Sequence, residues 1–340
     1  MQDQASNPNH SLFQPVARVV YASQANIAGS VYAQMEHIRA AAVRHNQPLG
    51  VYTALLHQSG WFIQWKEGPG GALRELMDRV AADPRHHSLR LVHASRGPRL
   101  LCGPWSMAIV QGTGTPDDMA RRVALLRRKM DAGWQYAPPA VWRQLSTPLQ
   151  HPGAEFQADP EAFQRVLVCS ARGLLAFELV HWLAQGHGQE AVQRRFAGAE
   201  HLDVGTDYVD FQQGERVMRV IAMARRGLAL PLTRAFVPDY SHVVVLLADD
   251  PAADIHLLHK VALACAHAPV RPVLLGVAAR PDTHGPLLRL ARELDLDYQA
   301  LQAPGGDAAL AWSAIEPALA RWREAANASQ AQPLQAVLHG

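Results

Sequence analysis

The most constraining feature of the sequence is a break in its pattern near the middle. Residues 145–162 (LSTPLQHPGAEFQADPEA) contain three prolines and little hydrophobic periodicity, which is typical of a linker. Strands and helices are mixed in an α+β pattern before this stretch, and strands alternate with helices after it. A chain of 340 residues also exceeds what one core usually supports. We therefore expect two domains, joined by a linker over 147–162.

Composition limits the class of protein. The chain is 49% hydrophobic and 18% charged, which excludes a disordered protein, and its net charge of +2 argues against a dedicated nucleic-acid binder. Its cysteines, Cys102, Cys169 and Cys265, fit neither a disulfide framework nor a zinc site, so a reducing cytosol is the expected compartment. Residues 1–15 lack the pattern of a signal peptide and are expected to be a tail, as are residues 327–340. The apolar runs are too short to cross a membrane.

The first half predicts five strands and two helices in the order βαββαββ. The strands are expected at 17–21, 51–56, 61–65, 89–94 and 107–110, and the helices at about 31–42 and 73–80. This order favours an α+β sheet with two helices on one face, over residues 16–112. Helices follow over 113–146, and Thr115-Pro116-Asp117 supplies the start signals of the first one. Its arginines are expected on a solvated face, with an acidic partner as the alternative.

Three polar residues stand where apolar ones would serve a plain sheet. Tyr21 ends the first strand, Asn46 follows a helix directly, and Gln64 lies inside a strand between apolar neighbours. Each has an ordinary structural explanation. A strand-end tyrosine is usually core, an asparagine after a helix is often a cap, and a strand glutamine is often exposed. Composition and periodicity take the interpretation no further.

Four segments stand in order over roughly residues 18–110, namely VVYASQA, HNQPLGVYTALLHQSGWFIQWKEG, RVAADPRHHS and PWSM. Together they resemble the BLUF family of blue-light sensors that use FAD. The spacing of 18 residues from Asn46 to Gln64, and of 15 from Gln64 to Arg79, also matches the family. The resemblance implies a ferredoxin-like BLUF fold with FAD as the cofactor.

The resemblance also implies roles for single residues. Tyr21, Gln64, Trp105 and Met107 fall on the positions of the photochemical switch. The flavin-binding positions fall on Ser23, His45, Asn46, Gln64, Arg79 and Asp83. The implied chemistry is transfer of an electron and a proton from the tyrosine to the excited flavin, followed by a change in the hydrogen bonds of the glutamine amide, which can both donate and accept. A BLUF-shaped domain without flavin is the alternative.

This sequence departs from the family at four places. Ala22 stands for the common arginine, Tyr52-Thr53 for Thr-Gly, His57 for a tyrosine, and Lys66 for the leucine of Leu-Glu-Gly. None of these changes removes a residue of the switch. Tyr52 and Lys66 are expected to alter the fit or the spectrum of the flavin.

The second half, residues 163–326, predicts an α/β doubly wound domain with a parallel sheet. Its apolar strands alternate with helices, in an order that resembles either a Rossmann-like or a small-GTPase-like P-loop domain. Ala176 and Phe177 stand where the phosphate loop needs lysine and serine or threonine. The switch and guanine motifs are also degraded, which argues against magnesium-dependent hydrolysis. Residual nucleotide binding at Gly173 and Asp282 is the alternative.

The sequence as a whole predicts a photoreceptor rather than an enzyme. Light absorbed by the first domain would act on a protein partner through the second domain, without direct contact to nucleic acid or membrane, and a homo-oligomer remains open. The helix after Thr115 and the linker are the expected relay. A non-photoactive scaffold and a nucleotide-binding regulator are the alternatives.

His256 and His259 lie one helical turn apart and could share a metal, but a solvated or capping role is expected because the sequence offers no third ligand.

Overall fold

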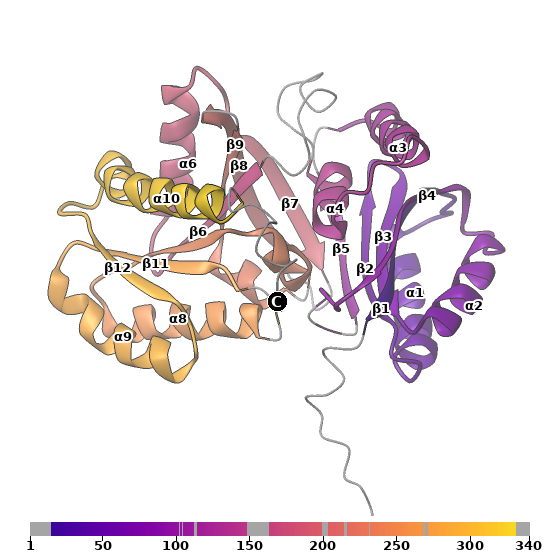
Figure 1. Ribbon diagram of the computed structural model, residues 1–340, viewed down its shortest axis with the longest axis horizontal. Coiled ribbons are helices and arrows are strands. Elements are labelled where there is room, and N and C mark those ends of the chain that lie inside the picture. The colour runs from indigo at the N-terminus through magenta and orange to yellow at the C-terminus, as the bar shows by residue number, and fades with distance from the viewer. Residues whose placement is uncertain are drawn as a thin grey trace, which may run out of the picture.

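A computed structural model describes residues 15–147 and 163–330, apart from 102, 104, 112–113, 199–202, 214–215, 231, 267 and 269–270. It shows two α/β halves side by side (Figure 1). The expected linker lies outside the described residues, as do both tails except for Pro15 and the end of the last helix.

The first half has the order βαββαββ that the sequence predicts. Its elements are β1 (Val16–Ala25), α1 (Val31–Asn46), β2 (Tyr52–Gln58), β3 (Trp61–Gly68), α2 (Gly70–Ala81), β4 (His86–Gly97), β5 (Trp105–Gln111), α3 (Pro116–Asp131) and α4 (Pro138–Ser146). The start of α3 follows the expected signals, because Thr115 and Asp118 form a reciprocal capping box. One expectation for α3 is wrong. Arg122 is buried rather than solvated, with its guanidinium beside the Met119 sulfur.

Helices cover both faces of the first-half sheet. Its strands lie in the order β5-β2-β3-β1-β4, and β3 is buried along its whole length. Met35 of α1 and Leu73 of α2 pack on one face, where they belong to two small apolar clusters. Met119 of α3 and Trp142 of α4 belong to the large cluster on the other face. On the first face, an open cavity lies between α1 and α2, and residues of both helices line it.

The second half is an α/β unit. The sequence predicted a parallel sheet for it, and this prediction is wrong, because the sheet is mixed. Its main elements are β6 (Phe163–Ser170), α6 (Leu175–Gly186), β7 (Val192–Gly198), β8 (Asp203–Gln213), β9 (Arg216–Met223), α7 (Thr233–Phe236), β10 (His242–Leu246), α8 (Pro251–Cys265), β11 (Val273–Ala278), α9 (His284–Glu293), β12 (Tyr298–Gln302) and α10 (Ala308–Gln330). Strands β12, β11, β10, β6 and β9 are parallel, whereas β8 and β7 run antiparallel. In Figure 1, α6 and α10 lie on one side of this sheet and α8 and α9 on the other.

A strand that the sequence did not reveal joins the two halves. Strand β7 pairs antiparallel with β5, from Ala108 opposite Gly198 to Gln111 opposite Arg195, and this pairing makes one 12-stranded sheet. The sequence of β7, VQRRFAG, has adjacent arginines and little apolar alternation. Pairing on both sides, with β5 and β8, stabilises a segment whose own propensity for a strand is weak.

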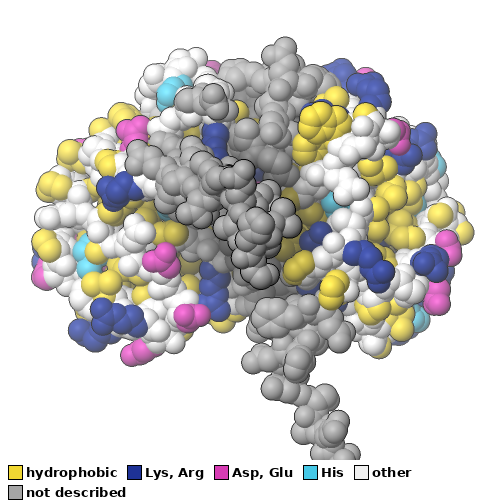
Figure 2. All heavy atoms as spheres, in the orientation of Figure 1, with side chains coloured by type: hydrophobic (Ala, Val, Ile, Leu, Met, Phe, Trp, Pro, Cys, Tyr) yellow, Lys and Arg dark blue, Asp and Glu magenta, His cyan; other side chains and the backbone are white. Residues whose placement is uncertain are grey.

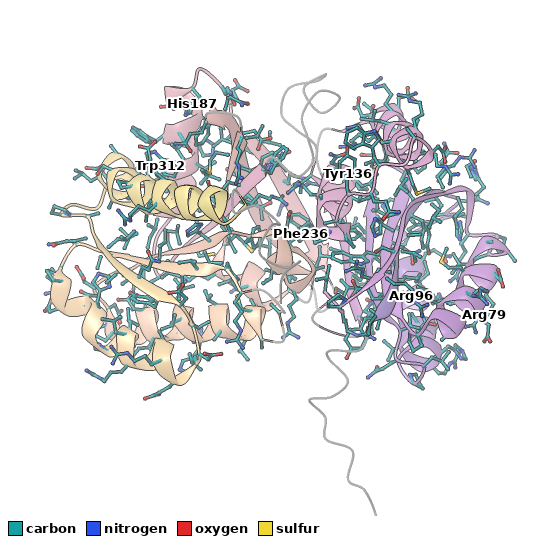
Figure 3. All side chains as sticks on the ribbon, viewed as in Figure 1. Arg79, Arg96, Tyr136, His187, Phe236 and Trp312 are labelled. Carbon is teal, nitrogen blue, oxygen red and sulfur yellow. The ribbon has the colours of Figure 1, made fainter. Side chains whose placement is uncertain are left out.

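Helix α4 lies between the halves and contacts both. Trp142 packs against Trp65 of β3 with ring centroids 6.1 Å apart, and against Phe236 of α7 with centroids 6.0 Å apart. Figure 3 shows Phe236 in the middle of the molecule, near α4. Arg143 Nη1 donates to Asp239 Oδ1 at 2.7 Å, and Arg165 of β6 contacts the other carboxylate oxygen. Buried aromatic and ionic contacts thus hold α4 against the second half.

No helix among the described residues is long and apolar enough to cross a membrane. Lys and Arg side chains are interspersed with Asp and Glu on the face drawn in Figure 2, as the small net charge suggests. Cys169 and Cys265 are buried free thiols, and Cys102 lies outside the described residues.

Candidate functional site

The predicted switch residues lie on the face of the sheet that α1 and α2 cover. Tyr21 of β1 is directly opposite Gln64 of β3 in the antiparallel register, so the two side chains point to the same face. Leu55 of β2 is opposite Gln64 on the other side, and Met107 of β5 is opposite Leu55. Tyr21, Gln64 and Met107 therefore lie in one row across the sheet, with Leu55 between the last two.

An open cavity of about 230 Å³ lies above this row, between α1 and α2. Six of the predicted site residues line it, namely His45, Asn46, Gln64, Arg79, Asp83 and Trp105. Tyr21, Ser23 and Met107 lie on the same face but do not line the cavity. They are buried in the sheet beneath or beside it. The folded chain thus brings together residues that span more than 80 positions of sequence.

The environment of Tyr21 keeps its phenol protonated. The side chain is fully buried, and burial followed by the nearby Asp83 carboxylate raises the pKa of the phenol well above its usual value of 10.0. The hydroxyl has no well-formed hydrogen bond within the described residues, although the Gln64 amide is near enough to oppose the rise in pKa. A neutral phenol beside an amide is a donor whose proton can move without a prior ionisation.

Unpartnered polar atoms test whether a flavin fits here. The hydroxyl oxygens of Tyr21 and Ser23 and the indole Nε1 of Trp105 are buried without a hydrogen-bond partner in the described part of the chain. Such atoms are costly to bury unless something satisfies them. Of these three groups, only the Trp105 indole lies in the cavity wall, together with the side-chain amides of Asn46 and Gln64. A heteroaromatic ring edged by carbonyls and ring nitrogens would offer these groups acceptors and donors, so the residues of the wall fit a flavin.

Local structure fixes the flavin-binding candidates from the helices. Asn46 is the last residue of α1, where its carbonyl oxygen accepts from the amides of Leu49 and Val51 at 3.1 and 3.0 Å. That turn leaves its side chain, only 6% exposed, at the cavity wall. It is therefore not a capping residue, because Gln47 occupies the cap position.

The predicted pair of Arg79 and Asp83 has a different arrangement from a simple helix ion pair. Both side chains line the cavity, and Figure 3 shows Arg79 on α2 at the outer side of the molecule. Asp83 instead binds Arg85, whose Nε donates to Oδ1 at 2.8 Å. That contact, more than any other, lowers the pKa of the Asp83 carboxyl, which stays ionised. Arg79 is thus left to face the cavity.

Besides aliphatic residues of α1 and α2, four lining residues did not appear among the predicted site residues. Phe62, Lys66, Arg85 and His86 also line the cavity. Strand alternation places Phe62 and Lys66 on the same face as Gln64, and this pattern could have predicted that they line the cavity. Arg85 and His86 lie in the segment between α2 and the start of β4, where sequence periodicity gives no direction for a side chain.

The second half places its candidate ligand residues apart from this cavity. Gly173 has φ of +66°, in the loop between β6 and α6. Ala176, at the expected lysine position, is buried in the core. Arg225 donates to the Ala171 carbonyl of that loop, and the exposed Asp282 has a carboxylate oxygen 3.8 Å from Arg280 Nε. Among the described residues, no cluster of three potential metal ligands occurs, His256 and His259 included.

Comparisons with known proteins agree with the geometry of the first half. Residues 16–108 match the BLUF family, described as sensors of blue-light using FAD. These residues form a BLUF domain. FAD is the cofactor of this family, and blue-light sensing is the function by which the family is described.

One curated relative and several solved structures extend the comparison. The chain is 30% identical over 112 residues to the photoactivated adenylate cyclase subunit beta-like protein FB of Euglena gracilis. That match covers 32% of this chain and only 13% of the relative. The dark-state structure of BlrB, a BLUF protein, is 29% identical to this chain. The alignment covers 34% of this chain and 84% of the BlrB chain, with a TM-score of 0.24.

A structure with wider coverage is much less similar in sequence. The structure of Klebsiella pneumoniae BlrP1 with FMN and cyclic diGMP is 11% identical to this chain. The alignment covers 84% of this chain and 76% of the BlrP1 chain, with a TM-score of 0.28. TM-scores this low carry no conclusion about the second half.

Proposed function

We propose that this chain is a blue-light photoreceptor whose switch consists of Tyr21 and Gln64. The observation that carries the proposal is the pairing of these two side chains on one sheet face, below a cavity that Asn46 and Gln64 line. Bound FAD would supply light absorption and an electron-accepting ring. Asn46, Arg79 and His45 would hold it, with Asp83 fixing Arg85 beside it.

The chain's own part in the switch is an exchange of hydrogen bonds. Tyr21 Oη is the proton donor, and the Gln64 amide relays the proton because it carries a donor and an acceptor on one group. After the exchange the amide presents the opposite group to the cavity. A net hydrogen bond is worth about 1 kcal/mol, so the two arrangements of the amide must be nearly balanced. Trp105, in the wall, and Met107, in the same row, would respond to the change.

The light-minus-dark absorption spectrum tests this proposal. We expect the purified chain to be yellow and to show a reversible red shift of its flavin absorption after blue light. The shift follows from a new hydrogen bond to the ring when Gln64 changes its arrangement. A colourless protein that takes up no added FAD would favour the scaffold alternative.

We infer that the output of the switch is a protein interaction made by the second half, and that this half is a degenerate GTPase-like domain rather than an enzyme. The carboxyl ends of β6, β9 and β11 meet at one edge of a parallel array, which is where such domains bind ligands. The three motif positions follow these strands, and the residues that would bind phosphate and magnesium are replaced there. Steady phosphate release from GTP or ATP with magnesium would contradict this inference.

The relay to the second half has two structural candidates. The helix after Thr115, which is α3, was expected from sequence together with the linker, and α4 follows it between the halves. The β5–β7 ladder adds a direct route from the strand of Trp105 and Met107. We expect amide hydrogen exchange to change on illumination at 108–111, at 195–198 and within 116–146, because these segments carry the contacts between the halves. Strand β12, at the far edge of the sheet, is the internal control. Identical exchange in dark and light at all three segments would exclude both routes.

A further inference from the structure

Lys66 occupies the wall of the flavin cavity on the same strand as Gln64. The two residues are two positions apart on β3, so strand alternation places both side chains on the cavity face, roughly 7 Å apart along the strand. Lys66 is opposite Thr53 of β2, and Thr53 is in turn opposite Trp105 of β5. Lys66 therefore lies with Trp105 in the neighbouring row of side chains on the same face, next to the row of Gln64.

Its burial is unusual for a lysine. The side chain is only 3% exposed. Its one described hydrogen bond is a long one, 3.5 Å from Nζ to Thr53 Oγ1, and it forms no ion pair within the described residues. The chain has three lysines and 29 arginines, so lysine is an uncommon cation in this sequence, and a buried one stands out. A buried ammonium without a counter-charge is expensive, so the amine must either lose its proton or find an electronegative partner.

Other titratable groups line the same cavity but none forms an ion pair with Lys66. They are His45 from α1, Arg79 from α2, and Asp83, Arg85 and His86 from the segment after α2. The only carboxylate among them is already bound to Arg85. Desolvation alone accounts for the lowered pKa of Lys66, about 7 against the usual 10.5. Lys66 is therefore poised between its two protonation states before a ligand binds.

We propose that Lys66 is a specificity-determining residue that pairs, as an ammonium, with the electronegative edge of the isoalloxazine ring, so that flavin binding is coupled to the uptake of a proton at Nζ. This inference rests on the proposed function, because it takes the ring to lie over Gln64. Its physical basis is that the electronegative edge of the ring can pair with the Lys66 ammonium, for which the described residues provide no carboxylate. The proton comes from solvent, and no covalent bond forms or breaks other than N–H.

The pH dependence of flavin affinity tests the proposal. We expect the dissociation constant of FAD, measured with flavin-stripped full-length chain, to rise about tenfold from pH 7 to pH 8.5, because the free amine is increasingly neutral over this interval while the complex keeps the ammonium. The pKa of Asp83 is lowered by its contact with Arg85, that of Arg85 is raised by the same contact, and that of His86 is lowered by burial, so none of these groups titrates in this window. Lys66→Met, which preserves length without charge, should bind FAD more weakly at pH 7 and lose the dependence on pH.

Two further measurements separate the ring from other causes. Riboflavin, which has the same ring but no phosphate, should show the same pH dependence, and a dependence seen only with FAD would overturn the assignment to the ring. With ¹³C-labelled lysine, the three Cε signals can be followed against pH, and the one missing in Lys66→Met should move to a higher titration midpoint when flavin binds. Lys129→Met, on α3 outside the cavity, is the matched control and should behave as the unchanged chain does.

The outcomes distinguish this inference from the function on which it rests. Binding of FAD that is equally tight at both pH values, with an unmoved Lys66 midpoint, overturns the role of Lys66 and leaves the photoreceptor intact. Failure of FAD to bind at any pH overturns the proposed function itself.

Discussion

Replacing Tyr21 with phenylalanine should abolish the light-induced red shift while leaving FAD bound. The substitution removes only the hydroxyl, which is buried and makes no well-formed hydrogen bond in the described structure. Little folding energy is therefore lost with it, and the cavity wall is unchanged because Tyr21 does not line it. The proton donor of the proposed switch is lost altogether. The light-minus-dark absorption spectrum measures the result.

Tyr32→Phe is the matched control, since Tyr32 is a tyrosine of α1 that is 37% exposed. We expect its spectrum to shift as that of the unchanged chain does. A full red shift in Tyr21→Phe would remove Tyr21 from the mechanism, and loss of flavin from this variant would show that the hydroxyl serves binding instead.

Replacing Asp239 with alanine should lower the free energy of unfolding by about 3–5 kcal/mol, the usual range for breaking a buried ion pair. Asp239 is the shared counter-charge of Arg143 on α4 and Arg165 on β6, and the two arginine side chains are 5% and 1% exposed. Its removal leaves two buried guanidinium groups without that carboxylate, at the contact between the halves. Urea denaturation followed by tryptophan fluorescence measures the change, because Trp142 lies at this contact.

Asp131→Ala is the control for charge removal at an exposed site. Asp131 pairs with Arg127 on the surface of α3, where both side chains are about half exposed. A loss of less than 1 kcal/mol is expected there. If Asp239→Ala cost no more than Asp131→Ala, the ion pairs of α4 would not hold the halves together. Asp239→Asn, which keeps the shape, provides a milder variant should the alanine form fail to fold.

Much of the fold could be predicted from local pattern. The order βαββαββ and the start of α3 at Thr115 depend on residues near in sequence, and the structure confirms them. Strand β7 could not be predicted, because its adjacent arginines resemble a solvated segment. Only pairing with β5 and β8 makes it a strand. The same long-range pairing turns a sheet expected to be parallel into a mixed one.

The candidate site divides in a similar way. Spacing and resemblance placed Asn46, Gln64 and Arg79 in one site, and the structure brings these side chains to one cavity. Their roles in binding and photochemistry stay predictions. The partner of Asp83 was not predictable, because the chain direction after α2 decides that it meets Arg85. The sequence likewise could not show that the indole Nε1 of Trp105 is buried in the cavity wall without a hydrogen-bond partner among the described residues.

The sequence by itself determined the alternation of side chains along β3, which puts Phe62, Gln64 and Lys66 on one face, because this alternation is a property of any extended chain. Only the tertiary structure decided that this face is closed over by helices while leaving a cavity. It also decided that Lys66 lies there without a carboxylate. Burial and the distance between charges are set by contacts between distant segments, and those contacts determine whether a polar side chain is a solvated residue or part of a site.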